Sequence, residues 1–490
     1  MTQTSFKLSD LFPEAQAAAG VSAPVADLVS DSRKAGPGSV FVAVPGTKVD
    51  GMAFAAQAAA KGAVAIVGEA EDPPAGLGEA VYLRVPDARR ALALAAARMH
   101  SRQPQTIVAV TGTSGKSSVA DFTRQIAATL GRKSASLGTL GVITSDGAAY
   151  GSLTTPDPIS LHQTLDRLAG EGITHLAMEA SSHGIEQRRL DGVRLSAAAF
   201  TNLGRDHLDY HGTTEAYAAA KLRLFDTLLT DSAPAVINAD GPFADVFIDA
   251  VRRRGLKLMT TGRAGETIRL IGNQPHGFTQ RLTVAAGGHT VSADLPLVGG
   301  FQVENALLAA GLVLATEGAG RDAAEILQAL AGLKGVPGRL EKVGEVNGAL
   351  CIVDYAHKPD ALAHALDALR PFTSGRLVCI FGCGGDRDRG KRPIMGQIAK
   401  ERADVVVVTD DNPRSEDPAA IRAEIMKGAP GAREIGSRSE AIRAAVRDLR
   451  PGDVLVVAGK GHETGQIIGD RTLPFSDHEE VRAAIAEIEG

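Results

Sequence analysis

The chain has 490 residues, of which 44% are hydrophobic and 22% are charged, so it is long enough for about three domains of ordinary globular composition. Its 52 Lys and Arg against 57 Asp and Glu give a formal net charge of −5, which excludes a general basic surface for nucleic acid or an anionic membrane. The lack of Trp and an aromatic content of 4% also argue against binding single-stranded nucleic acid by base stacking. Any phosphate binding must therefore be local.

The cysteines and the start of the chain indicate where the protein works. Cys351, Cys379 and Cys383 are too few for a disulfide framework and indicate buried thiols in a reducing compartment. Cys379 and Cys383 lack the second pair that a zinc site needs. The sequence opens without a signal peptide and contains no apolar run near the roughly 18 residues of a membrane span. We therefore expect a cytoplasmic protein without an inserted segment, and a monomer by default.

Short β-branched runs alternate with Ala-rich helical stretches along nearly the whole chain, which is typical of βαβ units and parallel sheets. The clearest predicted strands are AVAIVG (63–68), TIVAVTG (106–112), RLVCIFG (376–382), ADVVVVT (403–409) and DVLVVAG (453–459). A Gly, polar or Asp-rich turn follows each one, so we expect functional groups at the carboxyl ends of these strands. A stretch rich in Thr, Val and Gly, 257–300, is predicted to be an antiparallel insertion.

Two breaks divide the chain. SRQPQ (101–105) separates an Ala-rich helix from a strand, and KGVPG (334–338) ends a helical run. We therefore predict an α/β protein of three domains. They are a small N-terminal α/β domain at 1–103, a central mononucleotide-binding parallel sheet with a P-loop at 104–337, and a C-terminal Rossmann-like sheet at 338–490.

The most informative motif is TGTSGKSS (111–118), which lies between a predicted strand and the helical stretch VADFTRQIAATL. Backbone N–H groups at such a helix start bind phosphate oxygens, Lys116 adds a positive charge, and the Ser117 hydroxyl can reach Mg²⁺. The strict P-loop pattern fails because Val110 stands where it requires Gly, but the shorter form G-T-x-G-K-S is kept. The motif predicts ATP or GTP binding and does not identify the reaction.

The loop resembles the G-T-x-G-K-[ST]-[ST] loop of the Mur ligase family, whose members form amide bonds with ATP in peptidoglycan precursor synthesis. Ser114 replaces a common Asn, and Ser117-Ser118 replaces a common Thr pair, so small polar groups are kept. Other segments that resemble the family follow in order: LTTPDP (153–158), MEASSHGIEQRR (178–189), FTNLGRDHLDYHG (200–212), AAAKLRLF (218–225), FQVENALLA (301–309), GVPGRLE (335–341), VDYAHKPDAL (353–362), FGCGGDRDRGKRP (381–393), TDDNPR (409–414) and AGKGHE (458–463). The resemblance covers all three predicted domains. It implies the ligase that adds meso-2,6-diaminopimelate to UDP-N-acetylmuramoyl-L-alanyl-D-glutamate.

The resemblance also implies how the central domain works. ATP phosphorylates a carboxylate, an amine attacks the acyl phosphate, and catalysis depends on positioning and charge neutralisation. The implied ATP contacts are Gly112, Thr113, Ser114, Gly115, Lys116, Ser117, Ser118, Asn305, Arg339 and Asp354. The implied catalytic residues are Lys116, Glu179, His207 and Lys221, and the implied Mg²⁺ ligands are Ser117, Glu179, His207 and Lys221, the last as N6-carboxylysine. Taken alone, Lys221 has the pattern of a solvated helix residue, and Glu179 that of a solvated carboxylate at a strand end.

The N-terminal domain is implied to bind the uridine nucleotide. The implied contacts to the UDP-muramoyl dipeptide are Ser30, Ser32, Thr47, Lys48, Val49, Thr154, Thr155, Ser181, Gln187 and Arg189. By themselves Ser30 and Ser32 are ordinary turn residues. Arg188 competes with Arg189 for the role of anion contact.

The C-terminal domain is implied to bind the incoming amino acid through Arg387, Asp411, Asn412, Pro413, Arg414, Gly459 and Glu463. In TDDNPR an Asn-Pro turn follows a predicted strand and presents Arg414, whose planar fork can bind a carboxylate with two hydrogen bonds. Only diaminopimelate carries a distal carboxylate, so an Arg at that end selects it over lysine. The plain alternative for Arg414 is a surface turn.

Two rival functions stay open. A ligase like folylpolyglutamate synthetase shares the loop and the acyl phosphate chemistry, but is not expected to combine SDSR (30–33) with DNPR (411–414). A P-loop switch or transport ATPase would hydrolyse ATP without a peptide acceptor. Phosphate release with and without both co-substrates separates the three.

Overall fold

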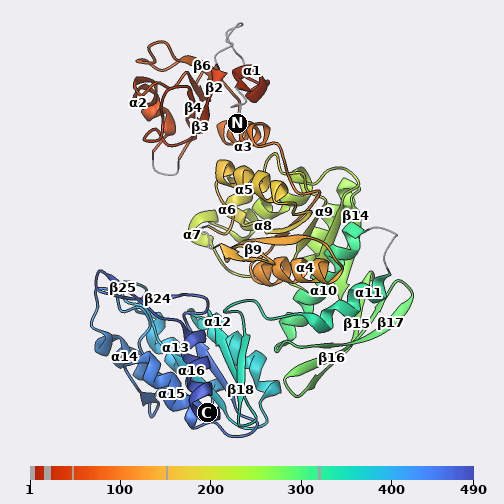
Figure 1. Cartoon of the computed structure of the whole chain (residues 1–490), viewed down its shortest axis with the longest axis vertical. Helices are drawn as coiled ribbons and strands as arrows, with labels where there is room; N and C mark the ends of the chain where they lie inside the picture. Colours follow the sequence, from red (N-terminus) through yellow and green to blue (C-terminus); the bar gives the residue numbers. More distant parts are fainter. Residues whose placement is uncertain (1–5, 16–23, 47–48, 150–152, 318–321) are drawn as a thin grey trace. The chain divides into compact units, whose positions relative to one another are not determined.

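The computed structural model describes residues 6–15, 24–46, 49–149, 153–317 and 322–490 (Figure 1). The chain divides into two compact units, one covering Met1–Thr260 with Gly311–Gly318 and the other covering Thr261–Ala310 with Ala319–Gly490. Each unit combines sheets with covering helices, so the predicted α/β class is confirmed.

The amino-terminal part of the first unit holds a four-stranded parallel sheet in the order β3-β4-β5-β6. Its strands are β3 (Asp27–Val29), β4 (Ser39–Val42), β5 (Ala65–Gly68) and β6 (Val81–Arg84). Around it lie β1 (Phe6–Lys7), α1 (Leu8–Leu11), β2 (Pro24–Val25), the 3-10 helix η1 (Gly51–Phe54), α2 (Ala55–Ala60) and α3 (Ala88–Met99). All four residues of β4 are buried, because the sheet has a hydrophobic core on each face. The predicted strand 63–68 is confirmed as β5.

The larger sheet of the first unit is built on five parallel strands in the order β8-β11-β7-β12-β13. They are β8 (Ser134–Gly138), β11 (His175–Glu179), β7 (Thr106–Thr111), β12 (Ala197–Phe200) and β13 (Pro234–Asn238). The strands β9 (Gly141–Thr144) and β10 (Gly147–Ala149) continue the sheet beyond β8, and β14 (Lys257–Gly262) continues it beyond β13. The helices are α4 (Lys116–Thr129), α5 (Pro158–Gly170), α6 (Ser182–Glu186), α7 (Leu208–His211), α8 (Thr214–Arg223), the π-helix η2 (Leu224–Leu228) and α9 (Ala244–Arg254). Parallel strands end at a common edge, so the loops after β8, β11, β7 and β12 meet there.

The second unit begins within β14 and continues into a three-stranded ladder. The ladder strands are β15 (Ile268–His276), β16 (Thr279–Ala286) and β17 (His289–Leu295), and both of their pairings are antiparallel. The predicted antiparallel insertion is thereby confirmed for 268–295, whereas β14 pairs in parallel with β15. The helices α10 (Gly300–Glu317) and α11 (Ala323–Gln328) and the 3-10 helix η4 (Ala329–Gly332) follow.

The second unit also holds a six-stranded sheet in the order β18-β19-β23-β20-β21-β22. Its strands are β18 (Glu341–Val346), β19 (Ala349–Asp354), β20 (Leu377–Phe381), β21 (Val405–Val408), β22 (Arg433–Glu434) and β23 (Val454–Ala458). Only the β18–β19 pairing is antiparallel. The other elements are α12 (Pro359–Leu369), the 3-10 helix η5 (Arg370–Phe372), α13 (Lys391–Arg402), α14 (Pro418–Met426), α15 (Arg438–Arg447), α16 (Asp477–Glu489) and the hairpin β24 (Gly465–Ile468) with β25 (Arg471–Pro474).

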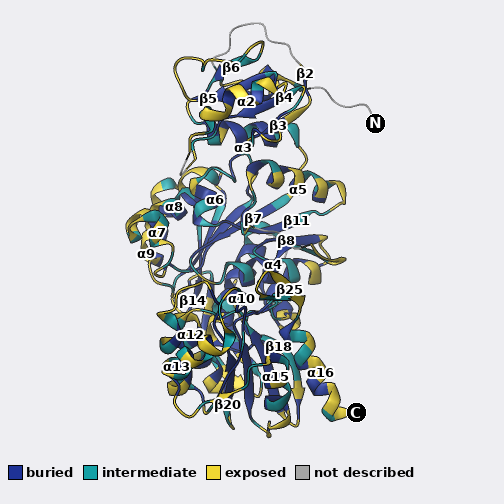
Figure 2. Cartoon of the chain, turned by 90° about the vertical axis from the view of Figure 1, so that its left-hand side faces the viewer, coloured by how far each residue is buried: buried dark blue, intermediate teal, exposed yellow. Residues whose placement is uncertain are grey.

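Helices cover both faces of this six-stranded sheet, as the Rossmann-like prediction requires. One core packs α12, α13 and α14 against the strands, and a second core packs α15 and α16 against the opposite face. The four inner strands β19, β23, β20 and β21 are accordingly buried almost throughout, while the edge strands β18 and β22 and the outer faces of the helices are more exposed (Figure 2). The predicted strands 376–382, 403–409 and 453–459 are β20, β21 and β23, which lie side by side, so the three loops that follow them share one edge.

No helix in the described part of the chain is long and apolar enough to cross a membrane. All three cysteines are buried, and burial raises the pKa of each thiol to about 12. They therefore behave as small hydrophobic residues, as predicted.

Candidate active site

The phosphate loop connects the end of β7 to the start of α4 at Lys116. Gly112 and Gly115 have φ angles of +147° and +84°, and a Cβ at Gly112 would lie 1.8 Å from Thr201 Oγ1. Only glycine fits such a position. Lys116 Nζ donates hydrogen bonds to the carbonyl oxygens of Gly112 and Thr113 at 3.0 and 2.9 Å, so its charge is held against the loop.

The loop is braced by two residues that follow β12. Thr113 N donates to Asn202 O at 2.8 Å, and both the backbone N and the Oγ of Ser114 donate to Asn202 Oδ1. Thr201 Oγ1 donates to Ser114 O at 2.7 Å. Thr201 and Asn202 were not predicted as site residues, although they stand in the segment FTNLGRDHLDYHG that carries part of the family resemblance. They preset the shape of the loop.

Glu179 ends β11 beside the phosphate loop, where the sequence places it. Its side chain is buried, and Ser117 Oγ donates to its Oε1 at 2.8 Å. Thr139, which follows β8, donates its backbone N–H to the same oxygen at 2.7 Å. Glu179 is therefore not the solvated carboxylate that the residue alone suggests, and a hydrogen bond joins it to Ser117.

Lys221 lies in α8 and is only 1% exposed, so the expectation of a solvated helix residue is also wrong. Its Nζ donates to Gly112 O at 2.8 Å and lies 4.4 Å from the ring centroid of Tyr217. Burial, with a smaller contribution from the charge of Lys116, lowers the pKa of Lys221 to about 6. The amine is therefore largely neutral at neutral pH.

His207 stands apart from these groups. It has a φ of +53° and an exposed side chain, and its ring centroid lies 5.0 Å from that of His183 and 6.1 Å from that of Tyr217. Among the described side chains no hydrogen bond joins the His207 ring to Ser117, Glu179 or Lys221. No group of three or more His, Cys, Asp or Glu that could hold a metal ion is found within the described ranges.

Several predicted dipeptide contacts form one network after β11. Thr155 Oγ1 donates to Glu179 O at 3.0 Å and accepts from Ser181 N at 3.1 Å. Arg189 donates Nη1 to Thr155 O at 2.6 Å and Nη2 to Gln187 Oε1 at 2.7 Å.

Thr154 lies next to this network, whereas Arg188 has a partner outside it. Thr154 Oγ1 lies 3.0 Å from Thr139 Oγ1, beside the Glu179 carboxylate. Arg188 has a φ of +63° and instead pairs with Asp87 at 3.1 Å. Of the two competing arginines, Arg189 is the one in the network.

The predicted uridine contacts follow β3 and β4. Ser32 is buried and donates its Oγ to Gln57 Oε1 at 2.9 Å, whereas Ser30 is exposed. Val49 is 55% exposed, and the predicted contacts Thr47 and Lys48 lie outside the described residues. No described hydrogen bond joins Ser30 to Ser32.

In the second unit the predicted ATP contacts Asn305, Arg339 and Asp354 come together. Asn305 Nδ2 donates to Gln302 Oε1 at 3.2 Å, and Gln302 Nε2 donates to Arg339 O at 3.1 Å. The Asp354 carboxylate accepts the backbone N–H groups of Leu340 and Ala356 at 2.7 and 2.8 Å. Burial raises the pKa of Asp354, against these hydrogen bonds. Gln302 was not predicted, although it stands two positions before Glu304 in FQVENALLA.

The loops after β21 and β23 meet around a buried lysine. Lys460 is fully buried, and its Nζ donates to Asn412 Oδ1 at 3.1 Å and to Glu463 Oε2 at 2.8 Å. Asn412 Nδ2 also donates to Glu463 Oε2 at 2.9 Å. A Cβ at Gly459 would lie 2.8 Å from Asp411 Oδ2. Asp411, Asn412, Gly459 and Glu463 are thus brought together as predicted, and Lys460 is the residue in AGKGHE that was missed.

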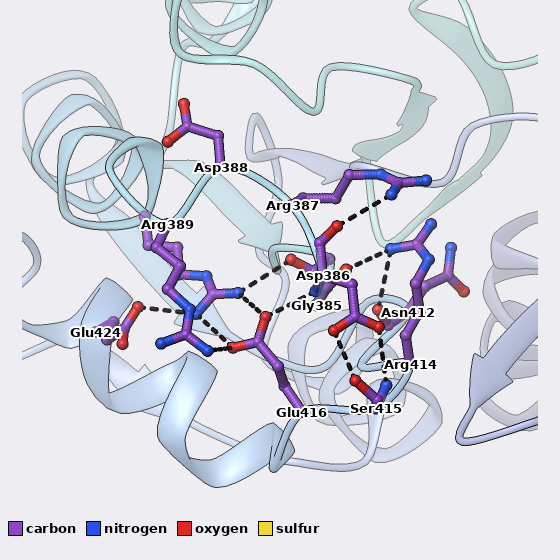
Figure 3. Close-up of polar contacts among 12 residues, drawn as sticks. Gly385, Asp386, Arg387, Asp388, Arg389, Asn412, Arg414, Ser415, Glu416 and Glu424 are labelled. Atoms are coloured by element: carbon purple, nitrogen blue, oxygen red, sulfur yellow. Dashed lines mark hydrogen bonds and ion pairs between the residues drawn. The ribbon is translucent and has the colours of Figure 1, made fainter.

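Arg387 and Arg414 lie on neighbouring loops, after β20 and β21, and extend toward the same side of the loop pair (Figure 3). Arg414 Nη1 donates to Gly385 O at 2.9 Å, and Arg387 Nη1 donates to Asp386 O at 3.0 Å. The hairpin holds the Arg414 backbone, since Arg414 N donates to Ile467 O and Gly469 N donates to Arg414 O at 2.7 Å. Each guanidinium keeps N–H groups beyond these bonds, which a carboxylate could accept.

Comparisons with known proteins cover nearly the whole chain. Three family models match it: the Mur ligase family catalytic domain at residues 25–100, the Mur ligase middle domain at 110–313, and the Mur ligase glutamate ligase domain at 338–461. A UDP-N-acetylmuramoyl-L-alanyl-D-glutamate--2,6-diaminopimelate ligase of Agrobacterium fabrum is 58% identical over 95% of this chain and 94% of its own length. A ligase of the same name from Bradyrhizobium diazoefficiens is 58% identical over 94% and 95%. A solved structure of such a ligase is 35% identical, covers 99% of this chain and 100% of its own, and has a TM-score of 0.76.

Proposed function

Because the chain belongs to the Mur ligase family, we propose that it is the ATP-dependent ligase that adds meso-2,6-diaminopimelate to UDP-N-acetylmuramoyl-L-alanyl-D-glutamate in peptidoglycan precursor synthesis. One observation carries the proposal. A phosphate loop and two arginine-bearing loops occur in a chain that matches diaminopimelate ligases along nearly its whole length. The product is an amide, so the enzyme is an acid–amino-acid ligase.

The reaction needs ATP because a carboxylate is a poor electrophile for an amine at neutral pH. An oxygen of the acceptor's glutamate carboxylate attacks the γ-phosphorus, ADP leaves, and an acyl phosphate forms. The diaminopimelate nitrogen then attacks the acyl carbon, phosphate leaves, and the nitrogen loses a proton. The protein contributes positioning and neutralisation of negative charge.

The residues 112–118 are the proposed cradle for the ATP phosphates. Two observations support this. The backbone N–H groups of the loop lie at the start of α4, and the charged end of Lys116 is already held against the loop. Asn305, Arg339 and Asp354 are the proposed contacts to the adenine, a phosphate and the ribose, and their support is that they cluster in the second unit around Gln302 and Leu340.

Mg²⁺ is the proposed metal, and Ser117 and Glu179 fit it. Ser117 and Glu179 offer oxygen ligands, which Mg²⁺ prefers, in one buried hydrogen-bonded pair. When bound, the metal neutralises charge on the phosphate oxygens. His207 and the modified Lys221 complete the proposed ligand set.

Lys221 is proposed to carry a carboxyl group on Nζ. Its nitrogen bonds to the carbon of CO₂ and releases a proton, which requires the neutral amine that burial favours. The resulting carbamate has an anionic oxygen where the free amine has none. The hydrogen bond from Lys221 Nζ to Gly112 O supports a role at the phosphate loop.

The acceptor is proposed to bind the first unit. Thr154, Thr155, Ser181, Gln187 and Arg189 would hold the muramoyl dipeptide, and their support is the shared network beside Glu179. Ser30, Ser32, Thr47, Lys48 and Val49 would hold the uridine diphosphate. This corresponds to proposed domains at 1–103 for the uridine nucleotide, 104–337 for ATP and 338–490 for the amino acid.

Diaminopimelate is proposed to bind the loops after β20, β21 and β23. Arg387 and Arg414 would bind its carboxylates, and Gly459 and Glu463 would meet its amino end. The other proposed contacts are Asp411, Asn412 and Pro413. Against lysine, which has no distal carboxylate, the Arg414 charge would be left unpaired. The partners are small molecules, and the protein is proposed to act in the cytoplasm as a monomer.

Phosphate release from ATP tests the function. We expect release only when UDP-N-acetylmuramoyl-L-alanyl-D-glutamate, meso-diaminopimelate and Mg²⁺ are all present, with the amide product detected by mass spectrometry. Turnover without the acceptor would contradict a ligase and favour a switch or transport ATPase. Turnover with a folate and glutamate instead would favour the folate-type rival.

A further inference from the structure

Behind the two arginine-bearing loops lies a set of ion pairs that no predicted substrate contact includes. Arg392, at the start of α13, is fully buried and donates Nη1 and Nη2 to the two carboxylate oxygens of Glu416 at 3.0 and 2.9 Å. Its Nη1 also donates to Glu424 Oε2 at 2.8 Å. Figure 3 shows Glu416 and Glu424 on the side of the loops opposite to the guanidinium groups of Arg387 and Arg414.

Glu416 joins this buried arginine to the loop that carries Arg387. Its Oε1 accepts the backbone N–H of Asp386 at 2.7 Å, directly before Arg387. Glu416 itself stands two residues after Arg414. One carboxylate therefore connects both loops to the interior of the unit.

The two loops are also joined directly to each other by one backbone and one side-chain hydrogen bond. Gly385 N donates to Asn412 O at 2.9 Å, and Ser415 donates its Oγ to Asp386 Oδ1 at 2.6 Å. The approach is so close that a Cβ at Gly385 would lie 1.9 Å from Pro413 O. A shift of either loop would therefore move both arginines.

Both loops hold a strained backbone at this point. Asp386 and Arg414 are non-glycine residues with φ angles of +54° and +52°, in the left-handed region. Such conformations persist where surrounding contacts over-determine them, and they are common where a site is set before its ligand arrives. Glu416 supplies one of these contacts through Asp386.

We propose that Glu416 is a positioning residue that sets Arg387 and Arg414 for the carboxylates of the incoming amino acid without touching that substrate. This rests on the proposed function for the identity of the amino acid. Arg392 holds Glu416 in place by a bidentate pair. Pre-organisation of this kind acts on the affinity for one substrate and leaves the use of ATP unchanged.

Two substitutions of Glu416 test the proposal by steady-state kinetics. In Glu416→Gln, the new amide NH₂ must face either guanidinium donors or the Asp386 N–H, so one contact is lost. In Glu416→Asp, the charge against Arg392 stays but the carboxylate withdraws from Asp386, which keeps the proposal testable if the Gln variant does not fold. We expect KM for meso-diaminopimelate to rise about 10-fold in both, with kcat changed by less than about 3-fold and KM for ATP unchanged.

Glu424→Gln is the matched control. Like Glu416→Gln, it removes one negative charge that pairs with Arg392. Among the described residues, however, Glu424 makes no hydrogen bond to residues 384–389. We expect KM for meso-diaminopimelate to stay within about 2-fold of the unchanged protein. An equal rise in Glu424→Gln, an unchanged KM in both Glu416 variants, or a parallel loss for every substrate would overturn the proposal.

Hydrogen exchange of the Asp386 amide separates this proposal from the proposed function. The amide should exchange faster in Glu416→Asp than in the unchanged protein or in Glu424→Gln, because its acceptor has withdrawn. This readout needs no substrate. If the unchanged protein does not use diaminopimelate, the proposed function fails while the exchange result still tests the link; unchanged exchange in Glu416→Asp would overturn the link itself.

Discussion

The phosphate-loop site and the arginine-loop site hold positive charge in opposite ways. At the first, Lys116 and Lys221 both donate to Gly112 O, and burial lowers the pKa of Lys221 to about 6. At the second, the arginines stay charged, and the carboxylate of Glu416, whose pKa is lowered to about 2 by hydrogen bonds from Arg392, ties their loops together. The first site changes the chemical state of a side chain, whereas the second preserves charge and controls position.

If the two sites divide the work in this way, substitutions should separate turnover from selection of the amino acid. The largest effect is expected for Lys221→Ala, which should lower kcat by about 10²–10³-fold because it removes a charge-stabilising group at the phosphate loop. KM for diaminopimelate should stay unchanged. An added short-chain carboxylate should restore part of the activity, which steady-state kinetics measures.

Lys133→Ala is the control for that change, because Lys133 is an exposed lysine of the same unit. It should leave kcat as it is. Full activity of Lys221→Ala would remove the proposed role of the carbamate.

Arg414→Ala should have the converse effect. It removes a guanidinium that can bind a carboxylate with two hydrogen bonds, so KM for meso-diaminopimelate should rise about 100-fold, while KM for ATP stays unchanged. Competition between diaminopimelate and lysine measures the loss of selectivity. Arg433→Ala, at an exposed arginine paired with Asp448, should change neither value, and equal damage to ATP use in Arg414→Ala would contradict the separation.

Gly138→Ala should weaken turnover by a smaller factor. A Cβ at Gly138 would lie 2.0 Å from Glu179 Oε1, so the carboxylate that accepts from Ser117 must move. We expect kcat to fall about 10-fold with KM for diaminopimelate unchanged. Gly36→Ala, where a Cβ meets nothing within 4 Å, is the matched control.

The two units should also differ in their response to acid. His162 is buried in α5 of the first unit, and burial lowers its pKa from 6.5 to about 4. Below pH 6.5 His162 binds a proton in the unfolded chain but stays neutral in the folded unit. The free energy of unfolding therefore falls between pH 6.5 and pH 4. The loss from pH 7 to pH 5 is about 2 kcal/mol. The Glu416 pair also loses its stabilisation as the pH falls, but only between pH 4.5 and about pH 2, so it is intact at pH 5.

Hydrogen exchange at pH 7 and pH 5 measures this difference unit by unit. Protection factors, which correct for the intrinsic slowing of amide exchange at lower pH, should fall in the first unit and change little around Glu416. His162→Gln should remove most of the pH 5 effect. An unchanged loss of protection between pH 7 and pH 5 in that variant would show that groups other than His162 cause the loss.

Much of the framework is predictable from sequence, because buried parallel strands are continuous apolar runs and their carboxyl ends meet at one edge. That reasoning correctly placed Glu179 beside the phosphate loop and the DNPR and AGKGHE loops beside each other. It failed for Lys221, whose burial depends on how α8 packs and not on its Ala-rich neighbours.

Side-chain partners between distant segments were also out of reach. The Arg392–Glu416–Glu424 pairs join two helices and a loop, and no local pattern marks them. The choice between Arg188 and Arg189 likewise depends on the left-handed backbone at Arg188, which tertiary contacts impose.

Isotope transfer from the acceptor tests the central claim most directly. If the glutamate carboxylate of UDP-N-acetylmuramoyl-L-alanyl-D-glutamate is labelled with ¹⁸O, an acyl phosphate pathway moves one labelled oxygen into the released phosphate. We predict labelled phosphate in proportion to amide product when ATP and meso-diaminopimelate are present. Unlabelled phosphate formed alongside the amide would contradict the account.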